Sequence, residues 1–255
     1  MFQRLLAGRS GLRLSLPKLA STCAVCHSWP AQQVCQPCIA RFASPGLRCD
    51  LCALPLPTDL SPGLRCSPGL CADCIRQPPP VDATLVAVNY GYPWAGLVSL
   101  YKFGDKPGWA AFFAALLLDT PGVRSVLEAM EPCDLLLPLP LSKERLQSRG
   151  FNQAWQLVGQ LAAQSATQAQ ADARSLLRVR DTQPQTDLKR AARLSNVEDA
   201  FQVDPLRAAE LAGRRIILVD DVMTSGATVF SAAKALRAAG ARHITAMAFA
   251  RTPAP

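Results

Sequence analysis

The chain has 255 residues, 49% of them hydrophobic, and a formal net charge of +8 at pH 7. This length accommodates one ordinary domain and a second small one. No uninterrupted apolar stretch approaches the roughly 20 residues of a membrane-spanning helix, so we expect no membrane insertion. Residues 1–17 lack the continuous apolar segment of a secretion signal, which predicts a cytoplasmic protein. The positive charge suits a polyanion, nucleic acid or pyrophosphate, without choosing between them.

Nine of the ten cysteines lie between Cys23 and Cys74, and most of them form pairs with two residues between the partners. Such spacing lets both thiolates of a tight turn face one metal ion, and two such turns complete a tetrahedral zinc site. The simplest assignment is sequential and gives two structural zinc sites, although the spacing also allows crossed pairing. The expected ligands are Cys23, Cys26, Cys35 and Cys38 for one site and Cys49, Cys52, Cys71 and Cys74 for the other. Cys66 is left over.

A disulfide framework is the alternative interpretation of these cysteines. It requires an oxidising compartment, and the chain shows no export signal. The region also has few large apolar residues, so we expect metal binding to supply most of its folding free energy. These features predict an N-terminal segment at residues 1–20 and a zinc-binding module at residues 21–77, with a stiff spacer of three prolines after it.

Residues 81–255 alternate short apolar stretches with stretches of helical periodicity. This alternation predicts an α/β domain with a parallel sheet flanked by helices. The expected strands are 85–92, 134–140, 176–180, 214–221 and 243–250. The expected helices are 94–103, 109–118, 123–130, one that opens at Ser142 and carries Phe151 and Trp155, and one that contains 231–239.

A basic segment follows the expected strand at 134–140. The strand leads into the sequence LPLP, and Arg145 and Arg149 come near the start of the next helix. Arginine is suited to bidentate contact with phosphate, so this segment is a candidate anion site. The alternative is a solvated basic helix face with Phe151 and Trp155 in the core.

The most informative stretch, residues 215–228, reads RIILVDDVMTSGAT. The segment begins with an apolar run that ends at two carboxylates, which is typical of a buried parallel strand. A turn of small residues and an amphipathic stretch follow, which are typical of a polar loop and a helix. Loops at the carboxyl ends of such strands bind ligands, and the N-terminus of a helix favours phosphate. The paired carboxylates suit sugar hydroxyls or a metal ion. The segment therefore predicts a pocket for a phosphorylated sugar, the alternative being a polar strand end with a helix cap.

This string resembles the signature with which type I phosphoribosyltransferases bind phosphoribosyl pyrophosphate (PRPP). The resemblance implies that Asp220 and Asp221 hold the ribose 2- and 3-hydroxyls at the catalytic centre. It implies that the 5-phosphate is wrapped by Thr224, Ser225, Gly226, Ala227 and Thr228. The segment with Arg145 and Arg149 then corresponds to the loop that binds the pyrophosphate, and Mg²⁺ accompanies PRPP.

The polar stretch at 181–199 lies where type I enzymes have a flexible loop that closes over the reacting centre. The resemblance therefore implies a lid that contains Arg180, Thr182 and Gln185 and excludes water from the site. The alternative is an ordinary polar linker.

Four motifs together resemble the ComF/GntX family of competence-related, phosphoribosyltransferase-like proteins, and the resemblance extends from Cys23 to Arg251. The motifs are the tandem cysteine pairs, LPLP with RLQSRGFNQA, RVRDTQPQTDL, and VDDVMTSGAT. The resemblance implies a double zinc ribbon followed by a phosphoribosyltransferase-like domain at residues 81–255. It also implies that Lys102 and Phe103 lie near the hood of the active site.

Three hypotheses about function follow. The first is an enzyme that transfers the phosphoribosyl group of PRPP to an acceptor that the sequence does not identify, in competence, DNA uptake or nucleotide metabolism. The second is a non-catalytic adaptor that binds single-stranded DNA through its zinc ribbons and basic surface, with Trp29 stacked on a base. The third is a zinc module for partner docking, for example with competence-machinery proteins, on an inactive α/β domain.

Overall fold

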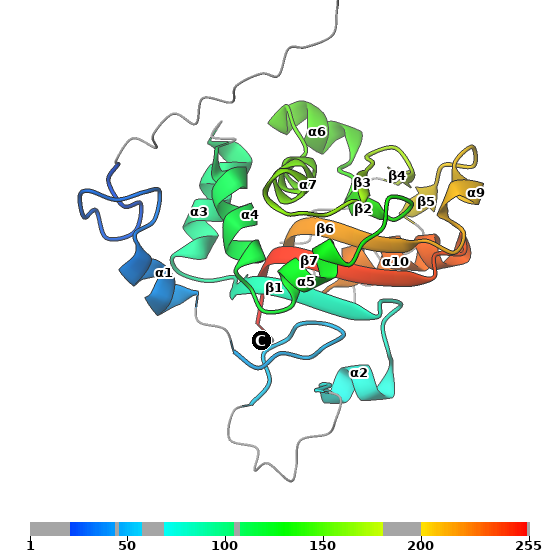
Figure 1. Cartoon of the computed structure of the whole chain (residues 1–255), viewed down its shortest axis with the longest axis horizontal. Coiled ribbons are helices and arrows are strands. Elements are labelled where there is room, and N and C mark those ends of the chain that lie inside the picture. The colour runs from blue at the N-terminus through cyan, green and yellow to red at the C-terminus, as the bar shows by residue number, and fades with distance from the viewer. Residues whose placement is uncertain (1–20, 44–45, 58–68, 105–107, 181–199, 254–255) are drawn as a thin grey trace, which may run out of the picture.

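A five-stranded parallel sheet forms the centre of the computed structural model (Figure 1), which describes residues 21–43, 46–57, 69–104, 108–180 and 200–253. Each strand runs parallel to its neighbours. The order across the sheet is β1 (Ala83–Asn89), β7 (His243–Arg251), β6 (Arg215–Met223), β2 (Leu135–Pro138) and β3 (Gln170–Ala171). The predicted α/β class, a parallel sheet flanked by helices, is confirmed.

Side chains alternate along β6, so this one strand contributes to two apolar cores. Ile217 and Val219 face one core, and Ile216 and Leu218 face the other. The first core is covered by α3 (Trp94–Phe103), α4 (Trp109–Leu118), α5 (Val123–Glu128) and α7 (Gln153–Gln164) (Figure 1). The second core is covered by α10 (Ala227–Ala238).

The helix predicted to open at Ser142 is two helices, α6 (Lys143–Arg149) and α7. The prediction of one helix was wrong because Gly150 takes a left-handed backbone conformation, with φ of 75°. Asn152 then starts α7, and its side-chain oxygen accepts a hydrogen bond from the amide of Ala154 at 2.9 Å. This break lets α6 project from the sheet while α7 packs on it.

Strand β6 extends to Met223, two residues beyond the prediction, so Asp220 and Asp221 lie inside the strand. Beyond β3, the chain forms a separate antiparallel pair, β4 (Leu176–Arg178) with β5 (Phe201–Val203). A short helix, α9 (Ala208–Leu211), follows. The segment 181–199, with Thr182 and Gln185, lies outside the described residues, and so does Cys66.

The two cysteine units pack against the sheet domain at different places (Figure 1). The first contains α1 (Gln36–Phe42) and packs beside α3, where Trp94 Nε1 donates a hydrogen bond to the Phe42 carbonyl at 2.8 Å. The second contains α2 (Ala72–Arg76) and packs beside β1, β7 and α10. Within the described part of the chain, no helix is both long and apolar enough to cross a membrane.

Candidate functional site

A cavity of about 660 Å³ opens at the carboxyl ends of β1, β2, β6 and β7. Strand β2 continues through α6 to α7 on one face of the sheet, whereas β6 continues into α10 on the other face. The loops that follow these two neighbouring strands therefore diverge. Such a topological switch point creates the crevice in which open α/β sheets bind ligands.

Most of the residues predicted to bind PRPP line this cavity: Asp220, Asp221, Thr224, Gly226, Thr228, Arg145 and Arg149. Ser225 and Ala227 belong to the same loop, residues 224–228, but are not among the described lining residues. The hydroxyl of Ser225 instead accepts a hydrogen bond from the Ala227 amide at 3.3 Å, which shapes the turn into α10.

The two carboxylates lie close together near the end of β6, where Oδ1 of Asp220 accepts a hydrogen bond from the amide of Asp221 at 2.8 Å. Asp221 is buried, and its carboxylate lies 3.0 Å from Nζ of Lys102, which α3 supplies. Burial raises the pKa of Asp220 to about 7, the charge of Asp221 adds to this, and Lys102 opposes it. The site therefore holds one carboxyl group that changes charge near neutral pH.

The start of α6 and the start of α7 position the two arginines of the basic segment. Ser142 caps α6 by accepting from the amide of Arg145 at 3.4 Å. Arg149, at the other end of α6, donates to Oε1 of Gln153 at 3.1 Å and lies over the ring of Phe103 at 5.0 Å. Arg149 is thus fixed by contacts on both sides, and its charge stays directed at the cavity.

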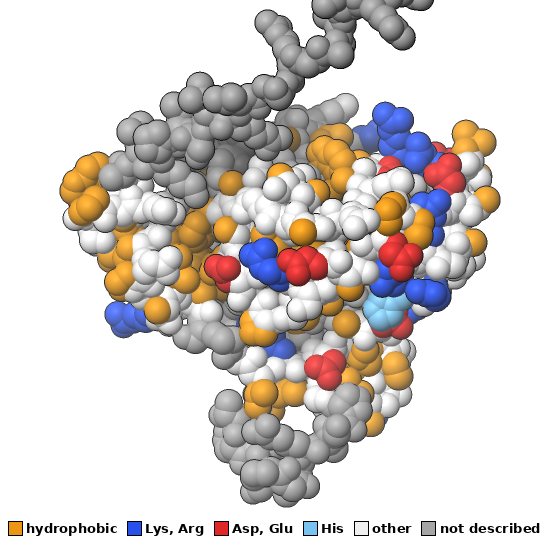
Figure 2. Space-filling view, in the orientation of Figure 1, with side chains coloured by type: hydrophobic (Ala, Val, Ile, Leu, Met, Phe, Trp, Pro, Cys, Tyr) orange, Lys and Arg blue, Asp and Glu red, His pale blue; other side chains and the backbone are white. Residues whose placement is uncertain are grey.

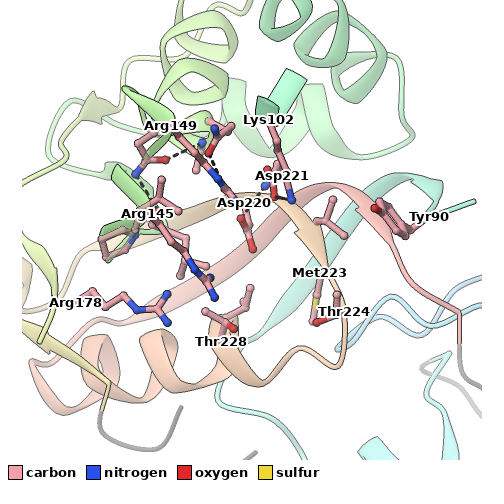
Figure 3. Close-up of a pocket in the computed structure, with 18 of the residues that line it drawn as sticks. Tyr90, Lys102, Arg145, Arg149, Arg178, Asp220, Asp221, Met223, Thr224 and Thr228 are labelled. Carbon is pink, nitrogen blue, oxygen red and sulfur yellow. Dashed lines mark hydrogen bonds and ion pairs between the residues drawn. The ribbon is translucent and has the colours of Figure 1, made fainter. Parts of the chain in front are cut away.

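Arg145 and Arg178 point into the part of the cavity that lies between Asp220 and Thr228 (Figure 3). Arg178 comes from β4, so three separate elements supply positive charge. Arg180, the predicted lid residue within the described part, is exposed just beyond that strand. Arg178 therefore lines the cavity where Arg180 was expected to act.

Positive charge gathers at this cavity more than on the broad face of the molecule shown in Figure 2. On that face the described Lys and Arg side chains are scattered, and several lie beside Asp or Glu side chains. The cavity in contrast receives Lys102, Arg145, Arg149 and Arg178. Because these cations surround two carboxylates, the site suits a ligand that combines anionic groups with hydroxyl groups.

The eight predicted zinc ligands form two clusters, in which the four sulfur atoms lie within 4.8 Å of one another. The grouping is the sequential one: Cys23, Cys26, Cys35 and Cys38 form the first four-cysteine site, and Cys49, Cys52, Cys71 and Cys74 form the second. Sγ atoms of Cys26 and Cys35 are 3.6 Å apart, as are those of Cys52 and Cys71. Zn–S bonds of about 2.3 Å in a tetrahedron place sulfurs roughly 3.8 Å apart, so both clusters fit zinc.

The environment of these thiols also fits a bound cation. Burial by itself raises the pKa of Cys23, but hydrogen bonds from the amides of Cys26, Cys35 and Val25 outweigh it and lower the pKa to about 6. Burial raises the pKa of Cys38 and Cys74 in the metal-free chain. A zinc ion supplies the positive charge that lets such buried thiols ionise together.

Comparison with known proteins agrees with this architecture. Residues 155–255 match the phosphoribosyl transferase domain. The DNA utilization protein YhgH of Escherichia coli (strain K12) is 28% identical over 244 residues, which cover 94% of this chain and 99% of that protein. Together these similarities support the predicted resemblance to the ComF family of phosphoribosyltransferase-like proteins.

Two further similar proteins carry competence in their names. Competence protein F of Haemophilus influenzae is 29% identical over 185 residues, covering 71% of this chain and 78% of that protein. Competence protein ComFC of Bacillus subtilis is 39% identical over 102 residues, covering 40% and 38% of the two chains. The predicted resemblance to the ComF family and the phosphoribosyltransferase-like fold with its double cysteine module are confirmed.

Some residues that line this cavity were not assigned to the ligand from the sequence. Lys102 and Phe103 entered only through the resemblance, and Tyr90 did not enter at all. Each belongs to β1, α3 or the segment between them, far from the main motif in sequence. A lysine and an aromatic residue at the end of an otherwise apolar helix are the signal that could have identified the first two.

Proposed function

We propose that this chain binds PRPP together with Mg²⁺ in the cavity and acts as a phosphoribosyltransferase-like protein. The observation that carries the proposal is a pair of carboxylates between two regions suited to anions. The 224–228 loop includes the N-terminus of α10, which suits a 5-phosphate. Arg145, Arg149 and Arg178 lie on the other side and suit a pyrophosphate.

The carboxylates of Asp220 and Asp221 would then accept hydrogen bonds from the ribose hydroxyls. Mg²⁺ carried in with PRPP would neutralise part of the pyrophosphate charge. The chain's own contribution is to orient the ribose and to hold cationic groups where negative charge grows as pyrophosphate departs. This assignment does not require any residue of the 215–228 segment to act as a general base.

Asp221→Asn is expected to weaken PRPP binding about tenfold, because a charge-assisted hydrogen bond becomes a neutral one and the ion pair with Lys102 is lost. Calorimetric titration with PRPP and Mg²⁺ measures this change. Asp172→Asn is the matched control, since Asp172 pairs with Arg207 at 3.3 Å and does not line the cavity. If Asp221→Asn binds PRPP as tightly as the wild type, the ribose assignment is wrong.

We further propose that the protein serves the use of DNA. The relatives that cover most of this chain are a DNA utilization protein and a competence protein, and these names support the proposal. PRPP in this context would link the use of DNA to nucleotide metabolism.

A second candidate function is binding of single-stranded DNA beside the first four-cysteine site, and a partly exposed aromatic cluster there favours it. Tyr92 is 76% exposed and meets Phe42 edge-on at 5.5 Å, while Arg41 lies over the same Phe42 ring at 5.2 Å. Trp29, in the same unit, is 67% exposed. Rings with an adjacent cation are the elements on which bases stack.

Tyr92→Ala is therefore expected to weaken the binding of fluorescent oligothymidine about tenfold, since base stacking contributes roughly 1–3 kcal/mol. Fluorescence anisotropy measures the affinity, which should also fall steeply as salt increases. Leu206→Ala serves as the control, because Leu206 is an exposed apolar side chain outside this cluster. Equal oligothymidine affinity in Tyr92→Ala and wild type would remove this candidate.

A further inference from the structure

The turn that carries the first two ligands of the second four-cysteine site is fastened to the sheet by three consecutive carbonyl groups. The carbonyls of Asp50 and Leu51 accept hydrogen bonds from the amide and hydroxyl of Thr84, at 2.7 and 2.6 Å. The carbonyl of Cys52 accepts one from Nε of Arg251 at 2.9 Å. Strands β1 and β7 therefore hold the backbone of this turn.

Arg251 also contacts the edge of the candidate ligand site. Its side chain is buried, and Nη1 donates hydrogen bonds to the carbonyls of Met223, at 3.3 Å, and of Thr224. Thr224 is the first residue of the 224–228 loop. One guanidinium group thus joins a cysteine-bearing turn to the loop expected to receive a phosphate. Because guanidinium is planar and rigid, it fixes the relative positions of the carbonyls that it bridges.

Phe230 makes a second connection between the same two features. It lies in the first turn of α10 and packs against the apolar cluster around Cys49, Cys52 and Cys74. Its ring also covers Gly226, where an added Cβ would lie 2.6 Å from Cε2 of Phe230. The ring therefore occupies the space between the second four-cysteine site and the bend of the loop.

We propose that zinc in the second four-cysteine site holds the 224–228 loop in its ligand-binding shape, with Arg251 and Phe230 as the positioning residues. The inference rests on the proposed PRPP site. Loss of zinc from the second site would free the turn at Cys52, and the loop would lose the support that these two side chains transmit. Because linkage is reciprocal, bound PRPP would raise the zinc affinity of the second site by the same factor.

The two four-cysteine sites provide matched variants for a test. Cys74 and Cys38 are both the last ligands of their sites, and both are buried. Cys74→Ser and Cys38→Ser should each lower zinc content, measured by metal analysis, to one ion per chain. Only Cys74→Ser should weaken PRPP binding, on the order of tenfold, and speed amide hydrogen exchange in the peptide 222–230.

Arg251→Lys and Phe230→Leu test the connection without removing a zinc ligand. Both should keep two zinc ions, accelerate exchange in peptide 222–230, and weaken PRPP binding. In Arg251→Lys, PRPP should no longer raise the zinc affinity of the second site in chelator competition, since an ammonium group lacks the planar fork of guanidinium. These variants also decide the question if Cys74→Ser fails to fold.

The results separate this inference from the proposed function. If the zinc-loaded wild type binds no PRPP, the proposed function fails, and exchange in peptide 222–230 still reports whether the second site supports the loop. If wild type binds PRPP, and Cys74→Ser and Arg251→Lys match it in affinity and in exchange, the inference is overturned. Equal loss of affinity in Cys38→Ser and Cys74→Ser would also overturn it, because support would not be specific to the second site.

Discussion

Gly226→Ala is expected to weaken PRPP binding about 100-fold. Backbone strain and steric crowding at this position together cost a few kcal/mol, which corresponds to roughly two powers of ten in affinity. Gly226 has φ of 85°, a conformation that a side chain disfavours. An added Cβ would also lie 2.8 Å from Cε of Met223 and closer still to the Phe230 ring. Phe230 packs against the second four-cysteine site, so the ring has little room to retreat. The loop would move instead, away from the ligand.

Calorimetry with PRPP and Mg²⁺ measures this loss, and Gly213→Ala is the control. Gly213 has φ of 74°, but an added Cβ there meets nothing within 4 Å. Gly213→Ala should cost about 1–2 kcal/mol of folding free energy from backbone strain and leave PRPP affinity unchanged. Wild-type affinity in Gly226→Ala would mean that the 224–228 loop does not closely surround the phosphate.

Long apolar or amphipathic elements could be predicted from the sequence, whereas very short ones could not. The helices at Trp94–Phe103 and Trp109–Leu118 have the predicted bounds, because their mainly apolar stretches end at a glycine and at an aspartate. Strands β3 and β5 have only two and three residues and carry no period. They exist because neighbouring segments pair with them, which is information that local sequence does not contain.

The same distinction applies to the candidate site. The carboxylates and the 224–228 loop are contiguous, so one motif was enough to predict that they lie together. Lys102 and Arg178 reach the cavity from α3 and β4, and only the topology places them beside the carboxylates. The role of Arg251 was not predicted from the sequence. The signal that pointed to it is a charged residue at the end of the mainly apolar strand HITAMAFAR.

PRPP affinity is expected to rise with pH up to about pH 7, because the carboxylate of Asp220 must be ionised to accept hydrogen bonds from ribose. The pKa of Asp220 is raised to about 7 by burial and by the charge of Asp221. Below that pH, binding requires loss of a proton, and affinity should fall about tenfold per pH unit. Calorimetry at a series of pH values measures the slope.

Asp220→Asn separates this effect from the titration of the phosphates of PRPP, which occurs in both proteins. The variant should bind PRPP more weakly at pH 7 and lose the part of the slope that Asp220 contributes.

The folding stability of Asp220→Asn should differ from that of the wild type in the opposite direction, since the variant is expected to be more stable at high pH. Since the folded pKa lies above the ordinary value of 3.8, the native state holds a proton that the unfolded state releases, and wild-type stability falls as pH rises from about 4 to about 7. Asp220→Asn cannot ionise, so its free energy of unfolding should lack this decline and exceed that of the wild type above pH 7. Chemical denaturation at several pH values measures it, and parallel profiles for the two proteins would show that Asp220 does not titrate in this range.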